Sequence, residues 1–422
     1  MSKSMKEKTG WQKTRKFFND VHLWLGLGSG LIIIAVCLSG TIYTYNTELR
    51  EWAAPHLHKV EVPENASRIP AEMAVASVKE VSGGQVTAIT IPNDPQRTYQ
   101  VNARVEGDNS RSGTSYYVNP YTGDITGTSK EKTATGEFMG YMFSLHRWLL
   151  LDKIEEPLIG ELPNRTLGSY ISGTATILFT LGVITGIIIW FPQKIKNWKQ
   201  GLKIKWSGNW KRINHDLHNT LAFYSLIFLF LMGITGPQWS FPWYRTGLQK
   251  TLGTYKEAPA RSESGRGSAG GDGARKEKAE TVAVNYLSIE EYISSADAAL
   301  PYKGDYRITL PKDGDTKIEI SKNKTGFFAP SASDKISLDA ATSEVISTDI
   351  FREKPFNERV AGSIKALHIG DIYGPFSKLL YFFACLIATS LPITGTIIWL
   401  NKLKKKGKRK VKSGKATTLQ TT

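Results

Sequence analysis

Cysteine is scarce in this chain, which has only Cys37 and Cys385 among 422 residues. Both lie inside long apolar stretches, so they cannot cross-link domains outside those stretches. Two cysteines at these positions also exclude a disulfide framework, a thiolate metal cluster and a cysteine nucleophile. Any redox chemistry in this protein must therefore use another kind of ligand.

Charged side chains are absent from four long stretches, residues 21–47, 166–193, 217–244 and 379–401. Each is longer than the roughly 20 apolar residues that a helix needs to cross a bilayer. A wholly soluble enzyme is therefore excluded, and we expect four membrane-spanning helices in contact with the phospholipid bilayer. The polar remainder brings the mean hydropathy to -0.25 and predicts sizeable domains outside the membrane.

Acidic residues are nearly missing from three short segments that are rich in lysine and arginine. Residues 1–20 carry six basic and two acidic side chains, residues 194–212 carry seven basic and none acidic, and residues 402–422 carry nine basic and none acidic. The positive-inside rule places both termini and the loop 194–216 in the cytoplasm. The net charge of +16 therefore indicates topology and attraction to anionic lipid, and no nucleic-acid partner is expected.

The same rule places residues 48–165 and 245–378 on the outer side of the membrane. Each segment predicts a small α+β module, because a helical pattern is followed by strand-like runs. The first module has a helix over 70–81 and strands over 85–91, 98–105 and 116–118; the second has a helix over 289–298 and strands over 305–310, 316–320 and 335–338. Residues 256–280, rich in serine and glycine, predict a flexible insert.

The chain also repeats itself in two halves. The first and third apolar stretches open with an Asp-aliphatic-His sequence, at residues 20–22 and 216–218, and reach a Ser-Gly or Thr-Gly pair 18 residues after the histidine. The second and fourth stretches end in Thr-Gly-x-x-x-Trp, and a histidine, His146 or His368, precedes each of them. Because both halves start in the cytoplasm, the sequence predicts a four-helix transmembrane bundle of two parallel repeats, with two periplasmic α+β modules.

The twofold repeat predicts that four histidines lie in two pairs of equivalent positions. His22 and His218 become equivalent positions at the cytoplasmic side, and His146 and His368 become equivalent positions at the outer side. Two imidazoles that approach from opposite sides suit the axial positions of a haem iron, whereas zinc normally needs three or four protein ligands. We therefore expect two haem groups, each bound by two histidines, with a single haem as the alternative.

Several neighbours bear on this hypothesis. Gly26 and Ala222 lie one turn after His22 and His218, where small residues leave room for a porphyrin. His215 is an alternative ligand to His218. The two residues are three positions apart, so in a helix they lie on the same face. Arg147 can pair with a haem propionate or remain an interfacial arginine.

Two further groups are candidate substrate contacts. Trp239, Trp243, Tyr244 and Arg245 follow the third apolar stretch at the outer face, where tryptophan also serves as an interfacial anchor. His56 and His58 form a His-x-His on the outer side and are candidates for a metal or substrate, or simply exposed residues.

Taken together, the four apolar stretches, His22 with Gly26, the Leu-His-Arg element at 145–147, the repeated Thr-Gly-x-x-x-Trp ending and the turn at 118–123 resemble the PepSY-associated transmembrane family. The resemblance covers nearly the whole chain. It implies a PepSY-like character for the outer modules, haem b, and the activity of ferric-siderophore reductases of the FoxB type. The second half departs from the pattern, because Ile369 follows His368 and Ala222 replaces the glycine.

The resulting hypothesis is transmembrane electron transfer from an unknown cytoplasmic or membrane donor to Fe(III) in a periplasmic siderophore. One alternative is a non-catalytic membrane protein whose outer modules bind peptide or sense the envelope. A proton-coupled transporter with histidine relays is the other, and it ranks last because the spans lack midplane carboxylates.

Overall fold

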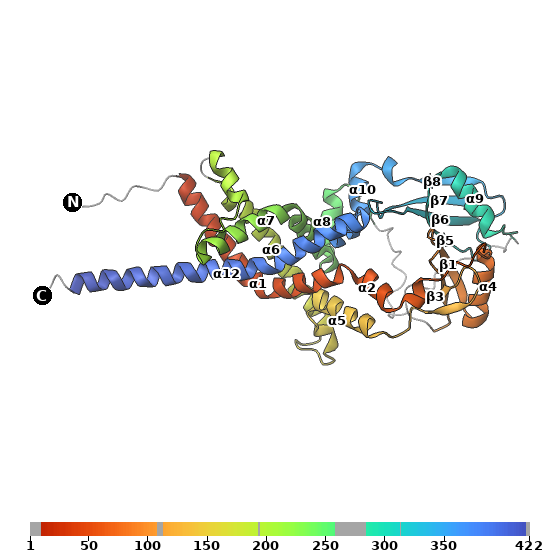
Figure 1. Ribbon diagram of the computed structural model, residues 1–422, viewed down its shortest axis with the longest axis horizontal. Coiled ribbons are helices and arrows are strands. Elements are labelled where there is room, and N and C mark those ends of the chain that lie inside the picture. Colours follow the sequence, from red (N-terminus) through yellow and green to blue (C-terminus); the bar gives the residue numbers. More distant parts are fainter. Residues whose placement is uncertain (1–9, 108–112, 193–194, 258–283, 313, 419–422) are drawn as a thin grey trace.

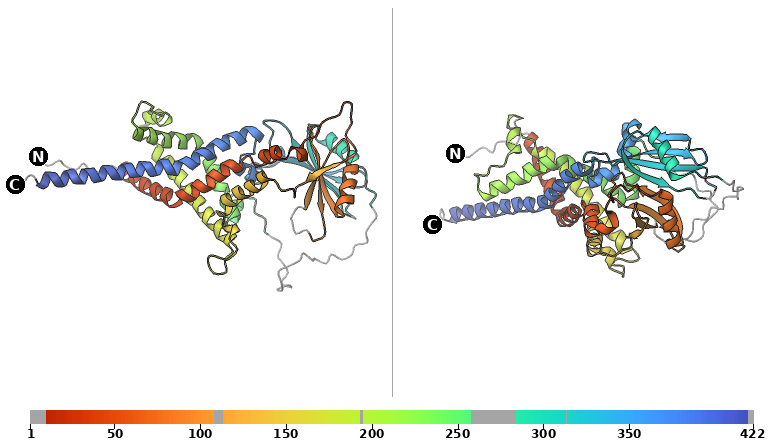
Figure 2. Two further views of the ribbon diagram at one scale, coloured as in Figure 1. Left: turned by 60° about the horizontal axis from the view of Figure 1, so that its bottom comes forward. Right: turned by 45° about the vertical axis from the view of Figure 1, so that its right-hand side comes forward.

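The computed structural model describes residues 10–107, 113–192, 195–257, 284–312 and 314–418. A bundle of long helices forms one end of the molecule, and a β-sheet forms the other (Figures 1 and 2). The first helix begins, and the last helix ends, at the end of the bundle that lies away from the sheet (Figure 1). Most of the insert predicted at 256–280 lies outside the described residues.

Four helices are long and apolar enough to cross a membrane, as the sequence predicts. They are α1 (Gly10–Tyr43), α6 (Asn164–Trp190), α7 (Trp210–Thr235) and α12 (Gly374–Thr418). Their most apolar 18-residue windows have mean hydropathies between 1.7 and 2.2.

Two of these helices extend well beyond their charge-free stretches. Helix α1 begins at Gly10, although its charge-free stretch begins at residue 21, and α12 continues to Thr418, beyond the predicted end at residue 401. Lysine, arginine and glutamine are good helix formers, so a helix that leaves the membrane can continue in water. The lack of charge therefore marks the apolar part of a helix and not its ends.

The four helices form a ring in which α1 and α7 occupy opposite corners. Helix α1 packs against α6 and α12, and α7 packs against the same two helices. Two shorter helices join the bundle at its sheet end: α5 (Ala134–Trp148) packs on α1 and α6, and α11 (Ile364–Ile369) packs on α7.

The outer segments form one sheet instead of two separate modules. Eight antiparallel strands lie in the order β4-β3-β2-β1-β5-β6-β7-β8. Their bounds are β1 (Gln85–Ile91), β2 (Tyr99–Arg104), β3 (Thr114–Val118), β4 (Ile125–Thr128), β5 (Gly304–Thr309), β6 (Lys317–Lys324), β7 (Ser333–Asp339) and β8 (Val345–Asp349). The halves join where β1 pairs with β5, with Ile89 opposite Ile308. The prediction of two modules was therefore incomplete.

A single apolar core underlies this joined sheet. Ile89, Val101, Ile308 and Leu338 are fully buried there, together with residues of α4 (Ala71–Ser82) and α9 (Ile289–Ala299). Burial of such side chains stabilises by about 1.5–3 kcal/mol each. Because the core spans both halves, neither half has a separate core of its own.

The N-termini of α4 and α9 meet, and each helix caps the other. The Ala71 amide donates to Glu290 Oε1 at 2.7 Å, and the Ile289 amide donates to Glu72 Oε1. Carboxylates at these positions satisfy free amides and match the positive ends of the helix dipoles.

The remaining helical elements are short and lie in the segments between the helices and strands already named. They are α2 (Asn46–Ala53), α3 (Pro55–His58), α8 (Pro242–Thr251), α10 (Phe356–Gly362) and the 3-10 turns η1 (Leu151–Lys153), η2 (Ile195–Leu202), η3 (Pro237–Trp239) and η4 (Phe351–Glu353). An ion pair of 2.6 Å joins Lys378 of α12 to Glu48 of α2. The loop between β6 and β7 reaches the start of α12, where the Ser331 amide donates to the Ile372 carbonyl at 3.4 Å.

Candidate functional site: two histidine pairs

Four histidines meet as two pairs within the bundle. The terminal pair is His22 of α1 and His218 of α7, whose ring centroids lie 6.3 Å apart with planes at 81°. The sheet-side pair is His146 of α5 and His368 of α11, whose centroids lie 6.2 Å apart with planes at 59°. Each pair thus contains one histidine from each repeat, as the repeat geometry predicts.

Threonines on the neighbouring helices hold the terminal pair. His22 Nδ1 lies 3.1 Å from Thr185 Oγ1 and 3.0 Å from the Gly182 carbonyl oxygen. His218 Nδ1 lies 2.9 Å from Thr394 Oγ1. Both threonines belong to the repeated Thr-Gly-x-x-x-Trp endings of α6 and α12.

The sheet-side pair is held in a related way. His368 Nδ1 lies 3.0 Å from Thr235 Oγ1 of α7. His146 Nδ1 lies 2.8 Å from the Val36 carbonyl oxygen of α1, and Ser39 donates to that same carbonyl at 3.0 Å. The Nδ1 of His146 therefore bonds to a backbone carbonyl, whereas the Nδ1 of each of the other three histidines contacts a threonine hydroxyl.

A glycine follows the serine or threonine at each of these four places, and we call each dipeptide a histidine seat. The seats are Ser39-Gly40, Thr185-Gly186, Thr235-Gly236 and Thr394-Gly395. A Cβ atom on the glycine would lie 2.9 Å from the histidine Cε1 at Gly40, 3.4 Å at Gly186, 3.4 Å at Gly236 and 3.3 Å at Gly395. Only at Gly40 would a Cβ atom overlap the imidazole, whereas at the other three glycines it would lie at or close to ordinary contact distance.

The hydrogen bonds also fix which ring nitrogen carries the proton. Thr185, Thr235 and Thr394 donate their hydroxyl hydrogens to carbonyls of their own helices, at 2.9, 2.6 and 3.0 Å. Their oxygens consequently accept from the histidine, and a backbone carbonyl can only accept. All four rings are thus assigned an Nδ1–H and an Nε2 lone pair. In the described part of the chain, none of these four Nε2 atoms has a hydrogen-bond partner.

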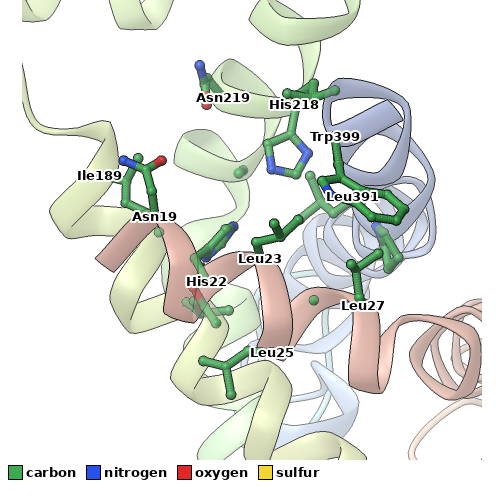
Figure 3. Close-up of a pocket in the computed structure, with 18 of the residues that line it drawn as sticks. Asn19, His22, Leu23, Leu25, Leu27, Ile189, His218, Asn219, Leu391 and Trp399 are labelled. Carbon is green, nitrogen blue, oxygen red and sulfur yellow. Dashed lines mark hydrogen bonds between the residues drawn. The ribbon is translucent and has the colours of Figure 1, made fainter. Parts of the chain in front are cut away.

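A cavity of about 420 Å³ surrounds the terminal pair. Figure 3 shows His22 and His218 on opposite walls, with their rings facing the space between them. Gly26 and Ala222 line this cavity, and so do Trp190 and Trp399, the last residues of the two repeated endings. The volume is typical of a pocket for a small molecule or cofactor.

Both pairs fit the two axial positions of one haem iron. With a metal–imidazole bond of about 2.0 Å and about 1.1 Å from Nε2 to the ring centre, two coaxial imidazoles have centroids about 6.2 Å apart. The observed separations are 6.3 and 6.2 Å. No group of three or more His, Cys, Asp or Glu among the described residues is arranged to hold a metal ion by itself. An iron ion held by one of these pairs would need its remaining ligands from another molecule, such as a macrocycle.

His215 lies apart from the terminal pair. Its side chain is 51% exposed, and its Nδ1 lies 3.6 Å from Asp216 Oδ1 and 3.1 Å from Asn219 Nδ2. It lines the mouth of the cavity, whereas His218 faces His22 across it. The geometry therefore favours His218 as the partner of His22.

The sheet-side histidines and the neighbouring Arg147 differ in charge. Burial lowers the pKa of His146, and burial together with His146 lowers the pKa of His368 to about 3, so both are neutral and can offer a lone pair. Arg147 is half-buried, and burial and then the charges of Arg165 and Arg245 lower its pKa. Its Nη2 donates to the Trp239 carbonyl at 3.4 Å, and its buried Nε has no partner in the described residues.

The candidate substrate residues separate into two places. Trp239 packs on His368 with ring centroids 4.9 Å apart, and Trp243 and Tyr244 lie beside each other at 5.6 Å, with Trp243 65% exposed. His56 instead pairs with Glu131 at 3.0 Å, and His58 packs on Tyr117 at 4.7 Å. These two histidines belong to α3, which packs against α2 and β4.

The two cysteines are free and lie together between α1 and α12. Cys385 donates to the Cys37 carbonyl at 3.1 Å.

The histidine seats are the functional feature that sequence reasoning missed. In the sequence, their Ser-Gly and Thr-Gly dipeptides indicated the repeat but not a contact with the histidines. The available signal was their number, because four such dipeptides at equivalent ends of four spans match four histidines.

Comparison with known families agrees with this architecture. A family model described as PepSY-associated TM region matches residues 20–402. The chain belongs to this family. The match includes both histidine pairs, all four seats and the joined sheet. It confirms the family expected from the sequence and makes the chain a membrane protein. Comparison with curated proteins gives no match.

Proposed function

We propose that this chain is a haem b protein of the bacterial inner membrane that moves electrons across the bilayer and reduces Fe(III) in periplasmic siderophores. One observation carries the proposal: two histidine pairs have ring centroids 6.2 and 6.3 Å apart, every Nδ1 is hydrogen-bonded, and no Nε2 has a hydrogen-bond partner among the described residues. Haem b, when bound at such a pair, supplies an iron that takes up and releases single electrons.

The protein's part in this function is to hold and orient the imidazoles. Hydrogen bonds to Nδ1 fix the ring orientation and raise the basicity of Nε2, as they do at other metal-binding histidines. Two imidazoles per iron leave no open position, which suits electron transfer and disfavours oxygen chemistry.

The spacing of the pairs supports a path across the membrane. His22 and Val36, which accepts the bond from His146, are 14 residues apart on α1, or about 21 Å at 1.5 Å per residue. The apolar core of a bilayer is about 30 Å thick. Two electron-carrying sites at this separation divide the apolar core into shorter steps for the electron. With one site, the electron would have to cross most of the core in a single step.

The orientation follows from charge. The basic residues at the start of α1, around η2 and at the end of α12 lie at the end of the bundle away from the sheet (Figure 1), which supports a cytoplasmic location for that end. The variants Lys205→Cys and Ser347→Cys test this with a membrane-impermeant maleimide, because both positions are exposed. In cells with a permeable outer membrane, Ser347→Cys is expected to react and Lys205→Cys only after lysis. The opposite labelling pattern contradicts the orientation.

The acceptor would dock at the sheet end of the bundle. Trp239 contacts His368, and Trp243, Tyr244 and Arg245 continue from it as a partly exposed surface. Reduction of Fe(III) weakens its binding by hard oxygen ligands, so a reduced siderophore releases its iron. The electron donor remains to be identified.

The decisive experiment is spectroscopic. Protein purified from haem-replete cells is expected to show a reduced-minus-oxidised b-type spectrum and two haems per chain. After anaerobic reduction with dithionite, addition of a ferric hydroxamate should reoxidise it. His146→Ala or His368→Ala should abolish this reoxidation, and His56→Ala serves as the control.

Two results would overturn the proposal. Colourless protein would favour the non-catalytic alternative, in which the sheet binds peptide or senses the envelope. Wild-type reoxidation in the His146→Ala and His368→Ala variants would remove the sheet-side pair from the path.

A further inference from the structure

Three arginines gather beside the sheet-side pair, and two of them flank one tryptophan. The guanidinium carbon of Arg147, on α5, lies 5.6 Å from the Trp148 ring centroid. That of Arg165, at the start of α6, lies 4.1 Å from the same centroid. Stacking on an aromatic face orients a guanidinium without neutralising it.

The third arginine approaches through the neighbouring turn. Arg245 of α8 donates from Nε to the Gln238 carbonyl at 3.3 Å, and Arg147 donates from Nη2 to the adjacent Trp239 carbonyl at 3.4 Å. The three side chains thus converge from three helices on Trp148 and η3. We call them the arginine cluster.

The charge of this cluster is not balanced by protein groups. Within the part of the chain that the structure describes, no carboxylate forms an ion pair with Arg147, Arg165 or Arg245. Arg147 Nε is buried and has no acceptor there. Arg165 and Arg245 are exposed, so an anion can reach the cluster from outside. Three like charges at such short range favour a bound anion.

The repeat does not reproduce the cluster, which takes Arg147 and Arg165 from the first half and Arg245 from the second. Ile369 stands where the repeat would place the equivalent of Arg147. On that side of the bundle, Lys378 is already paired with Glu48 at 2.6 Å. A structural need common to both repeats therefore does not explain the cluster.

The geometry points to a carboxylate-binding site formed by Arg147, Arg165 and Arg245 beside the sheet-side histidine pair. Guanidinium groups bind carboxylates through two parallel hydrogen bonds, which makes carboxylate the matching chemistry. Two sources can supply it: the propionates of a haem at His146 and His368, or the carboxylates of an anionic Fe(III) chelate. The first source rests on the proposed function, because it requires a haem at this pair.

The test uses the full-length protein in detergent with the double variant Arg165→Gln/Arg245→Gln. Lys250→Gln is the matched control, because it removes a positive charge from the same helix as Arg245. One arm measures haem retention against an excess of a haem-scavenging apoprotein. The other arm measures citrate binding by calorimetry at low salt.

The results separate the two sources. If haem propionates occupy the cluster, the double variant should lose one of its two haems at least about tenfold faster, while citrate binds neither protein. If a soluble chelate supplies the carboxylates, haem retention should be unchanged and the citrate affinity should fall at least about tenfold. Arg147→Gln should reproduce either effect without altering the other two arginines, which guards against a folding defect in the double variant.

The proposal fails if both arms are unchanged in the double variant, or if Lys250→Gln has effects of equal size. Colourless protein would overturn the proposed function but leaves the citrate arm as an independent test of the site.

Discussion

The histidine seats make a quantitative prediction about glycine. Gly40 and Gly186 occupy equivalent places in two seats, but their clearances differ. A Cβ atom at Gly40 would lie 2.9 Å from both Cε1 and Nδ1 of His146, whereas one at Gly186 would lie 3.4 Å from Cε1 of His22. The same substitution to alanine should therefore be harmful at Gly40 and tolerated at Gly186.

The expected size follows from the overlap. Relief of the contact at Gly40 requires a shift of about 0.5 Å between α1 and the His146 ring, and forced overpacking of this kind typically costs about 1–3 kcal/mol. That range corresponds to a haem affinity lowered by about 5- to 150-fold at the sheet-side pair, since each 1.4 kcal/mol is a factor of ten. The alanine itself improves helix propensity by about 1 kcal/mol at either place, so the helices should still form.

The assay is haem transfer from the purified protein to a haem-scavenging apoprotein, followed by absorbance. Gly40→Ala should release one of two haems quickly and keep the other at the parent rate, while Gly186→Ala should match the parent. Equal rates for both variants, or faster loss from Gly186→Ala, would refute the assignment of these glycines as histidine seats.

Other expectations follow from the terminal pair and the sheet. His22→Ala and His218→Ala should each remove the same haem, and His215→Ala should leave it in place; haem quantitation on the three variants decides which histidine is the ligand. In the sheet, burial and the hydrogen bond with Glu290 raise the pKa of Glu72 above its ordinary 4.5, so its stabilising contribution is full below pH 4.5 and is lost as the pH rises through the folded-state pKa. The melting temperature of Glu72→Gln, relative to that of the parent, should therefore rise as the pH rises toward neutrality. A difference in melting temperature that does not change with pH contradicts this reasoning. The pKa of Glu290 is lowered, so Glu290→Gln should show the opposite trend.

Much of the fold could be predicted from the sequence because strong physical signals mark it. A charge-free run longer than a membrane is thick has few alternatives to a spanning helix. Strand β1 was predicted with its observed bounds, because Gln85–Ile91 is a short run composed mainly of β-branched residues. The edge strands β4 and β8 were missed, since β8 is exposed at every position and carries no alternation.

The joining of the two outer segments could not be predicted in the same way. Pairing of β1 with β5 depends on two edges meeting after more than 200 intervening residues, and no local pattern specifies such a partner. The information lies partly in the repeat: two equivalent modules related by an axis must place equivalent edges face to face. The reciprocal caps from Glu72 and Glu290 arise from the same symmetry.

The sequence predicted which histidines form the site but not which groups hold their rings in place. The equal spacing in the two halves was enough to pair His22 with His218. The acceptors of their Nδ1 atoms were not foreseen, because a threonine in a membrane helix usually bonds to its own backbone. Thr394 does so through its hydrogen and still accepts from His218 through its oxygen.

The seats also give a physical reason for the duplication itself. Each repeat seats its own two histidines: His22 of α1 bonds to α6, and His218 of α7 bonds to α12. Yet each pair takes one histidine from each repeat, across the diagonal of the bundle. A single repeat would therefore present one imidazole at each level and no imidazole facing it. Two copies facing each other about one axis complete both levels at once, and the same interface joins β1 to β5. Sequence changes that break this symmetry, such as Arg147 in the first repeat where the second has Ile369, then distinguish one side of an otherwise symmetric site.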